Sequence, residues 1–119
     1  MAEQQTYDLE NRLIAFAVMV LNLVEQLPLT YAGKHLGGQL TRSGTAPALI
    51  YGEAQAAESR KDFVHKMRLC LKELRESQIC LKIIAAKPLL EKAVVEPVLE
   101  ECGQLVAIFT ASVKKAGGG

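Results

Sequence analysis

The sequence has no tryptophan, few aromatic residues and no large excess of either charge. Aromatic residues fill only 5% of the 119 positions, so the core must consist of Leu, Val, Ile and Ala, a composition typical of helical proteins. The formal net charge of +1 excludes a strongly basic molecule. Any nucleic-acid binding must therefore come from a local patch. The length suits one domain, residues 1–119, with its own core.

Long apolar runs and export signals are also missing. The longest uninterrupted apolar run covers residues 13–21, whereas a helix that spans a bilayer takes about 20 residues. The first ten residues carry acids where a secretory signal carries Lys or Arg. We therefore expect no membrane association and a cytoplasmic location. Cys70, Cys80 and Cys102 lie far apart without a C-x-x-C motif, and we expect them to be reduced and to act as small apolar residues.

Residue patterns for catalysis, cofactors and metals are absent from the sequence. No Ser or Cys has a His placed to act as its base, and no glycine-rich nucleotide-binding motif occurs. A di-iron bundle needs two Glu-x-x-His pairs, and the nearest match, Asp62-x-x-His65, occurs once. We expect no catalytic or metal-binding residue, no cofactor and no small-molecule substrate. The protein is predicted not to be an enzyme.

Four segments show apolar residues at every third or fourth position, the period of an amphipathic helix. This pattern predicts helices over about residues 7–26, 34–57, 59–86 and 96–115. Ser59 is the expected N-cap of the third helix, with Asp62 completing a capping box, and its apolar stripe has a gap at Ser77. Pro97 is expected in the first turn of the fourth helix, and residues 116–119 are expected to fray.

The predicted fold is all-α, an antiparallel bundle of four helices with up-down-up-down topology. The stretch RSGTAPALIYGEAQ, residues 42–55, places Pro47 inside the second helix. Proline removes one helical hydrogen bond, so we expect a bend there, with Gly44 and the nearby hydroxyls relieving strain. The alternative is a break into two separate helices.

Three segments carry no charged residue, namely residues 13–24, 43–52 and 102–113. A helix on the surface of a monomeric bundle needs polar residues on its solvent side. Because these segments lack them, we expect the chain to bury a second face against copies of itself, as a homo-oligomer. The alternative is that alanines in these segments are simply tolerated at the surface.

The third predicted helix carries cationic residues that repeat every three or four positions, offset by about half a turn from its apolar stripe. We name them the basic strip: Lys61, His65, Arg68, Lys72, Arg75 and Lys82. They are the candidate nucleic-acid-binding residues, since cationic side chains neutralise phosphates. An oligomer would repeat the strip in every subunit, so individually weak contacts would together give a stronger affinity. The alternative is an ordinary solvated helix face.

Four stretches carry a family resemblance: AGKHLGGQLTRSGT (32–45), YGEAQAAESRKDFVHKM (51–67), LKELRES (71–77) and LEECGQLVAIFTASVKKA (99–116). They resemble the four-helix-bundle proteins encoded within intervening sequences of bacterial 23S ribosomal RNA genes, also called S23 ribosomal protein-like. The most specific part is the RSG-type second helix followed by D-F-x-H-K and L-K-E-L in the third.

The resemblance implies a left-handed up-down bundle assembled as a ring-shaped homopentamer. It also implies kinship with the accessory protein of diversity-generating retroelements, a basic pentamer that engages a reverse transcriptase and nucleic acid. RNA or a nucleic-acid-associated protein is thus the expected partner besides the chain itself. The sequence departs from the family at Ala46 and Ile50, where members commonly carry Ser and Asn, so apolar packing is expected to replace a polar cluster.

Overall fold

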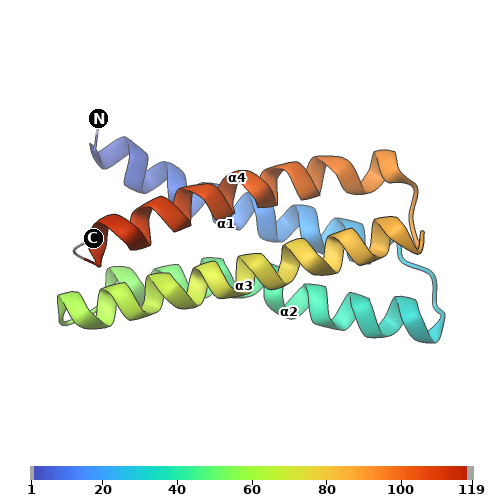
Figure 1. Cartoon of the computed structure of the whole chain (residues 1–119), viewed down its shortest axis with the longest axis horizontal. Coiled ribbons are helices and arrows are strands. Elements are labelled where there is room, and N and C mark those ends of the chain that lie inside the picture. The colour runs from blue at the N-terminus through green and yellow to red at the C-terminus, as the bar shows by residue number, and fades with distance from the viewer. Residues whose placement is uncertain (1, 118–119) are drawn as a thin grey trace.

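The computed structural model describes the backbone of residues 2–117 and the side chains of residues 9–117. This part of the chain forms four α-helices and no strand, which confirms the all-α prediction. The helices are α1 (Ala2–Val24), α2 (Tyr31–Gln55), α3 (Arg60–Ala86) and α4 (Lys92–Ala116). Figure 1 shows the chain passing back and forth along the longest axis, 44 Å. Each helix packs on the next and α4 returns to α1, so α1 and α3 face each other across the core.

Helix α1 ends at Val24, two residues before the predicted end. The amides of Gln26 and Leu27 donate to carbonyls three residues back, at 3.0 and 3.1 Å, so the last turn tightens before Pro28. At its other end the helix begins at Ala2, earlier than the predicted residue 7. The apolar residues at every third or fourth position are buried, namely Leu13, Phe16, Val20 and Leu23 in the helix and Leu27 just after it.

Helix α2 begins three residues before the predicted start, because Thr30 is its N-cap. The Thr30 hydroxyl accepts a hydrogen bond from the Gly33 amide at 3.1 Å. The helix then continues through Pro47 to Gln55, so the alternative of two separate helices is wrong, and residues 56–57 lie beyond its end. The bend at Pro47 stays a prediction.

Gly44 allows α1 and α2 to approach each other closely. A Cβ atom at this position would lie 2.7 and 2.8 Å from the two methyl groups of Val20. Such distances are shorter than carbon atoms tolerate, so any side chain at residue 44 would push the helices apart. The glycine of the RSG motif is therefore a packing residue.

Helix α3 begins as predicted, with Ser59 as N-cap. The Ser59 hydroxyl accepts from the Asp62 amide at 3.0 Å. The apolar stripe of this helix is Phe63, Met67, Cys70, Leu74, Leu81 and Ile84, at spacings of three and four with the gap at Ser77. All are buried except Phe63, which is half-buried at the edge of the core.

The predicted start of the fourth helix at residue 96 is wrong, because α4 begins at Lys92. The Val94 and Val95 amides already donate to the Glu91 carbonyl, and Val95 is fully buried, which stabilises the early turn. Pro97 consequently lies inside the helix, on its exposed side. The helix also includes Ala116, which was expected in the tail, and Gly117 is its C-cap. Residues 118–119 of the predicted tail lie outside the described residues.

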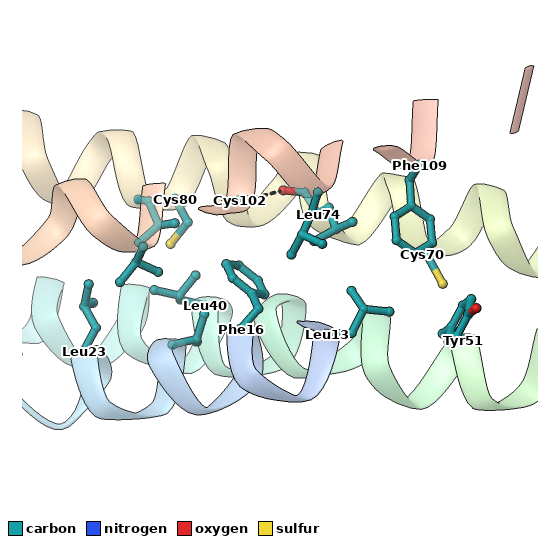
Figure 2. Close-up of a cluster of buried hydrophobic side chains, with 14 of the residues drawn as sticks. Leu13, Phe16, Leu23, Leu40, Tyr51, Cys70, Leu74, Cys80, Cys102 and Phe109 are labelled. Atoms are coloured by element: carbon teal, nitrogen blue, oxygen red, sulfur yellow. Dashed lines mark hydrogen bonds between the residues drawn. The ribbon is translucent and has the colours of Figure 1, made fainter. Parts of the chain in front are cut away.

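The core is a column of aliphatic side chains with aromatic rings from three helices. Figure 2 shows Phe16 of α1 and Phe109 of α4 pointing into the same interior as Leu13 and Leu74. Tyr51 of α2 meets Phe109 edge to face, with ring centroids 6.1 Å apart. At the seam between α1 and α4, Arg12 donates to both carboxylate oxygens of Glu101, at 3.1 and 2.8 Å.

The charge-free part of α1 leaves apolar side chains at the surface of the single chain. Ile14, Val18 and Leu21 are exposed by 49%, 50% and 40%. They repeat every three or four positions, so they form one apolar face beside the buried one. Within residues 2–117, no helix combines the length and apolar character that a membrane crossing requires.

Candidate nucleic-acid interface

The structure places all six residues of the basic strip on the exposed side of α3. They lie opposite the buried stripe because the two sets differ by about half a turn of a helix with 3.6 residues per turn. From Lys61 to Arg75 the strip extends about 21 Å at 1.5 Å per residue.

Beyond Arg75 the exposed side of α3 becomes partly apolar. Ile79 and Ile83 are exposed by 56% and 47% and lie between Arg75 and the end of the helix. Lys82 is therefore separated from the other five cationic residues by apolar surface. The compact part of the basic strip is its first half.

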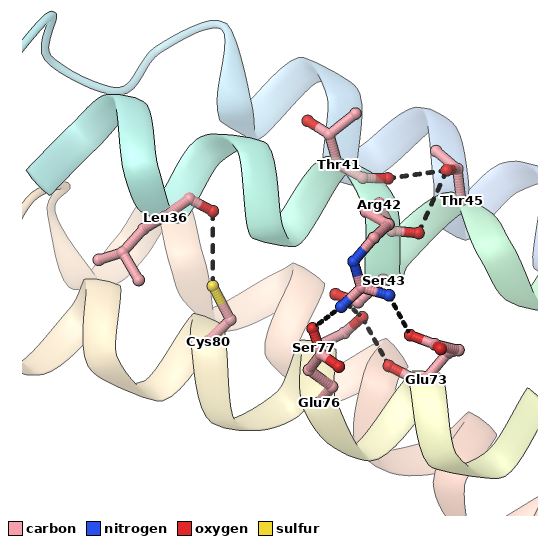
Figure 3. Close-up of polar contacts among 9 residues, drawn as sticks. All are labelled: Leu36, Thr41, Arg42, Ser43, Thr45, Glu73, Glu76, Ser77 and Cys80. Atoms are coloured by element: carbon pink, nitrogen blue, oxygen red, sulfur yellow. Dashed lines mark hydrogen bonds and ion pairs between the residues drawn. The ribbon is translucent and has the colours of Figure 1, made fainter.

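Two carboxylates of α3 beside the strip, Glu73 and Glu76, are bound by α2. Figure 3 shows Arg42 of α2 reaching between Glu73 and Glu76. One guanidinium nitrogen lies 2.9 Å from Glu73, and the other forms a short contact with Glu76. These hydrogen bonds, with that of Glu76 the larger cause, raise the pKa of the Arg42 guanidinium.

A second ion pair joins the same two helices. The Lys66 ammonium lies 2.8 Å from Glu53 of α2, and this hydrogen bond raises the pKa of Lys66. Among the described residues, the ion pairs involve Arg12, Arg42, Lys66 and Lys92, and none includes a residue of the strip. The positive charge of the strip is thus not balanced by its neighbours on α2.

Two cationic residues that matter at this surface were missed by the sequence pattern. Arg42 lies on another helix and acts by binding acids, which only the packing of α2 on α3 reveals. Arg60 is the first residue of α3, and its guanidinium donates to the Ala116 carbonyl at the end of α4, at 3.1 Å. No local sequence signal pairs residues 60 and 116.

The gap in the apolar stripe at Ser77 is filled by a polar contact. The hydroxyls of Ser77 and Ser43 lie 2.9 Å apart, and both residues are fully buried (Figure 3). Ser77 also lies 3.0 Å from the Glu73 carbonyl. Each hydroxyl has one hydrogen, so both contacts are satisfied when Ser77 donates to the carbonyl and accepts from Ser43. The serine of the RSG motif therefore fixes the position of α2 on α3.

A sequence model of the family described as 23S rRNA-intervening sequence protein matches residues 5–111. The chain belongs to this family. Its fold is similar to the crystal structure of a protein of unknown function from the S23 ribosomal protein family of Bacteroides thetaiotaomicron VPI-5482. The two are 25% identical with a TM-score of 0.80, over 89% of this chain and 98% of the other. Among curated proteins, none matches the sequence.

This member of the 23S rRNA-intervening sequence protein family is half-buried at the two positions where its sequence departs from the resemblance, Ala46 and Ile50. Ile50 packs against the core cluster. The polar contact within the bundle is instead the one between Ser43 and Ser77.

The cysteines of this family member lie in the core rather than at a reactive site. Burial raises the pKa of the Cys70 and Cys102 thiols to about 12 and that of Cys80 to about 11. Each thiol donates to a backbone carbonyl, for example Cys102 to Leu74 at 3.3 Å. In the described part of the chain, no three His, Cys, Asp or Glu residues come together as metal ligands.

Proposed function

We propose that this protein is a non-enzymatic, cytoplasmic subunit of a homo-oligomeric scaffold that binds RNA through the basic strip of α3. The observation that carries the proposal is that the strip is exposed while Glu73, Glu76 and Glu53 are bound by Arg42 and Lys66. Cations without a paired carboxylate neutralise phosphates and release counterions, which gives a salt-dependent affinity.

Homo-oligomerisation is part of the same proposal. The proposed subunit is an antiparallel up-down-up-down bundle, and the family resemblance suggests a ring of five. The apolar face of α1, formed by Ile14, Val18 and Leu21, supports burial against another copy. A ring repeats the basic strip in every subunit, so contacts that are weak in one copy add up along one RNA.

Charge reversal tests the RNA-binding surface. The variant Arg68→Glu/Lys72→Glu/Arg75→Glu is expected to lose binding to structured RNA in a titration at low salt. The matched control Lys34→Glu/Lys87→Glu/Lys92→Glu changes the net charge equally at exposed positions away from the strip and is expected to bind nearly as well. Equal loss in both variants, or no salt-dependent affinity in the unmodified protein, would contradict the proposal.

Sedimentation tests the assembly. Val18→Glu places a charge on the apolar face of α1 and is expected to shift the protein to smaller species. Thr110→Glu, at an exposed position of α4, is the control and is expected to leave the mass unchanged. An unmodified protein that sediments as a folded single subunit at micromolar concentration would overturn the oligomer.

A second candidate function is a protein-binding module without a nucleic-acid role. It is favoured by Leu29 and Tyr31, which are exposed by 85% and 90% in and after the turn between α1 and α2. Leu29 also lines a groove of about 370 Å³ with Gly37 and Gly38. A purified complex that survives nuclease treatment, and is lost in Leu29→Ser/Tyr31→Ser, would support this function over the first.

A further inference from the structure

A groove lies at the end of the bundle where α3 begins and α4 ends. Figure 1 shows these two helix ends side by side near the C-terminus. The groove has a volume of about 620 Å³. Its lining residues are Arg60, Lys61, Val64, His65, Arg68, Ala116 and Gly117.

Two arginines of the groove lie at the end of α4. Arg60 donates to the Ala116 carbonyl at 3.1 Å. Arg68 lies next to Gly117, where a Cβ atom would come 3.4 Å from its Nη2. The Gly117 amide in turn donates to the Val113 carbonyl at 2.8 Å, which fixes the cap. The two guanidinium groups thus lie at the same turn of the backbone, and the hydrogen bond to Ala116 positions that of Arg60.

The lining is cationic, and the described residues that form it include no carboxylate. Lys61 adds a third positive charge, and Lys114 and Lys115 follow in the last turn of α4. The nearby carboxylate of Asp62 acts on Lys66, whose pKa is raised by its hydrogen bond to Glu53 and, in smaller part, by the charge of Asp62. The groove lies between the N-terminus of α3, which is partly positive, and the C-terminus of α4, which is partly negative. These partial charges offset each other, so the charged side chains determine the sign of the electrostatic potential in the groove.

We propose that this groove binds a phosphate group through Arg60, Lys61 and Arg68. Arginine matches phosphate oxygens with paired N–H donors, and three cations converging on one groove favour a doubly charged phosphomonoester over a singly charged phosphodiester. The phosphate can be free or can end a nucleotide or RNA chain. Only the last of these sources rests on the proposed function.

The test is a titration of the full chain, followed by the backbone amide signals in NMR spectra. The probes are inorganic phosphate and uridine 5′-monophosphate, with chloride at equal ionic strength as the reference. We expect saturable shifts concentrated at residues 60, 61 and 117. Equal affinity for both probes indicates recognition of the phosphate alone, and tighter binding of the nucleotide indicates that the site also contacts the nucleoside.

Substitutions inside and outside the groove on the same helix provide the matched control. Arg60→Gln/Arg68→Gln is expected to weaken phosphate binding about tenfold or more, because two charge-assisted hydrogen bonds are lost. Lys61→Gln tests the groove without removing the contact of Arg60 to Ala116. Lys72→Gln/Arg75→Gln, outside the groove, is expected to leave phosphate binding unchanged.

The results separate this site from the proposed function. Shifts no larger than those caused by chloride, or equal weakening in the groove variants and in Lys72→Gln/Arg75→Gln, would overturn the phosphate site even if RNA binds. Saturable phosphate binding with no affinity for RNA would leave the groove assigned and remove the RNA-binding function.

Discussion

The hydroxyls of Ser43 on α2 and Ser77 on α3 lie 2.9 Å apart in the interior of the bundle. They are the only polar residues among the fully buried side chains of residues 9–117. The contact joins α2 and α3, which pack on each other more extensively than any other pair of helices. All other buried residues of α3 are apolar. A buried polar pair of this kind favours one register of α2 on α3, since sliding either helix would break the contact and leave the Ser43 hydroxyl without its partner.

The two serines are expected to contribute unequally to stability. Ser77→Ala leaves the Ser43 hydroxyl buried without its partner and should lower the free energy of unfolding by about 1–3 kcal/mol. Ser43→Ala should cost less, because Ser77 keeps its bond to the Glu73 carbonyl. Urea denaturation at one protein concentration measures both. The double variant should be more stable than the sum of the single effects predicts, and strict additivity would contradict the contact.

Gly44→Ala is expected to destabilise the protein by about 1–3 kcal/mol, because the added methyl group collides with the stiff Val20 side chain. Gly52→Ala is the control, since nothing lies within 4 Å of a Cβ atom there. That substitution should stabilise α2 by up to about 1 kcal/mol through helix propensity. Thermal unfolding compares the two. Equal effects of the two substitutions would show that propensity, not the approach of α1, decides the outcome.

Arg42→Gln is expected to weaken RNA binding about two- to fivefold without altering the strip itself. The substitution releases Glu73 and Glu76, whose charges then act on Lys72 and Arg75 one position away along α3. Lys34→Gln makes the same change in net charge at a distant exposed position. An RNA titration in which both variants behave alike would show that the ion pairs with α2 do not govern the potential of the strip.

The three cysteine thiols are expected to resist a thiol reagent at pH 8 until the protein unfolds. Their pKa values are raised from 9.0 to between about 11 and about 12, so they stay protonated in the folded state. The unfolded state loses these protons first as the pH rises. The stability that the buried thiols contribute is therefore complete below about pH 9 and is lost as the pH approaches 12. Rapid labelling of the native protein would contradict their burial.

The four elements could be predicted because each carries a long stripe of apolar residues with the period of a helix. The errors in the prediction lie at the ends of the helices, where a single local contact can determine the residue at which a helix begins. The Thr30 hydroxyl starts α2 three residues early, and burial of Val95 extends α4 back past Pro97. The basic strip could also be predicted from the sequence. Its residues lie about half a turn away from the apolar stripe of the same helix, so they must be exposed when that stripe is buried. Arg42 and Arg60 act through contacts with distant segments, which no periodicity encodes.

Exposed apolar side chains repeat every three or four positions on two helices that face each other across the core, Ile14, Val18 and Leu21 on α1 and Ile79 and Ile83 on α3. Such a subunit can touch two neighbours through unlike surfaces, in a head-to-tail manner. Contacts of this heterologous type give a closed ring when a whole number of subunits completes one full rotation about the ring axis, and otherwise they give an open filament. In the proposed oligomer, the angle between these two surfaces, more than the strength of either contact, would set the number of copies.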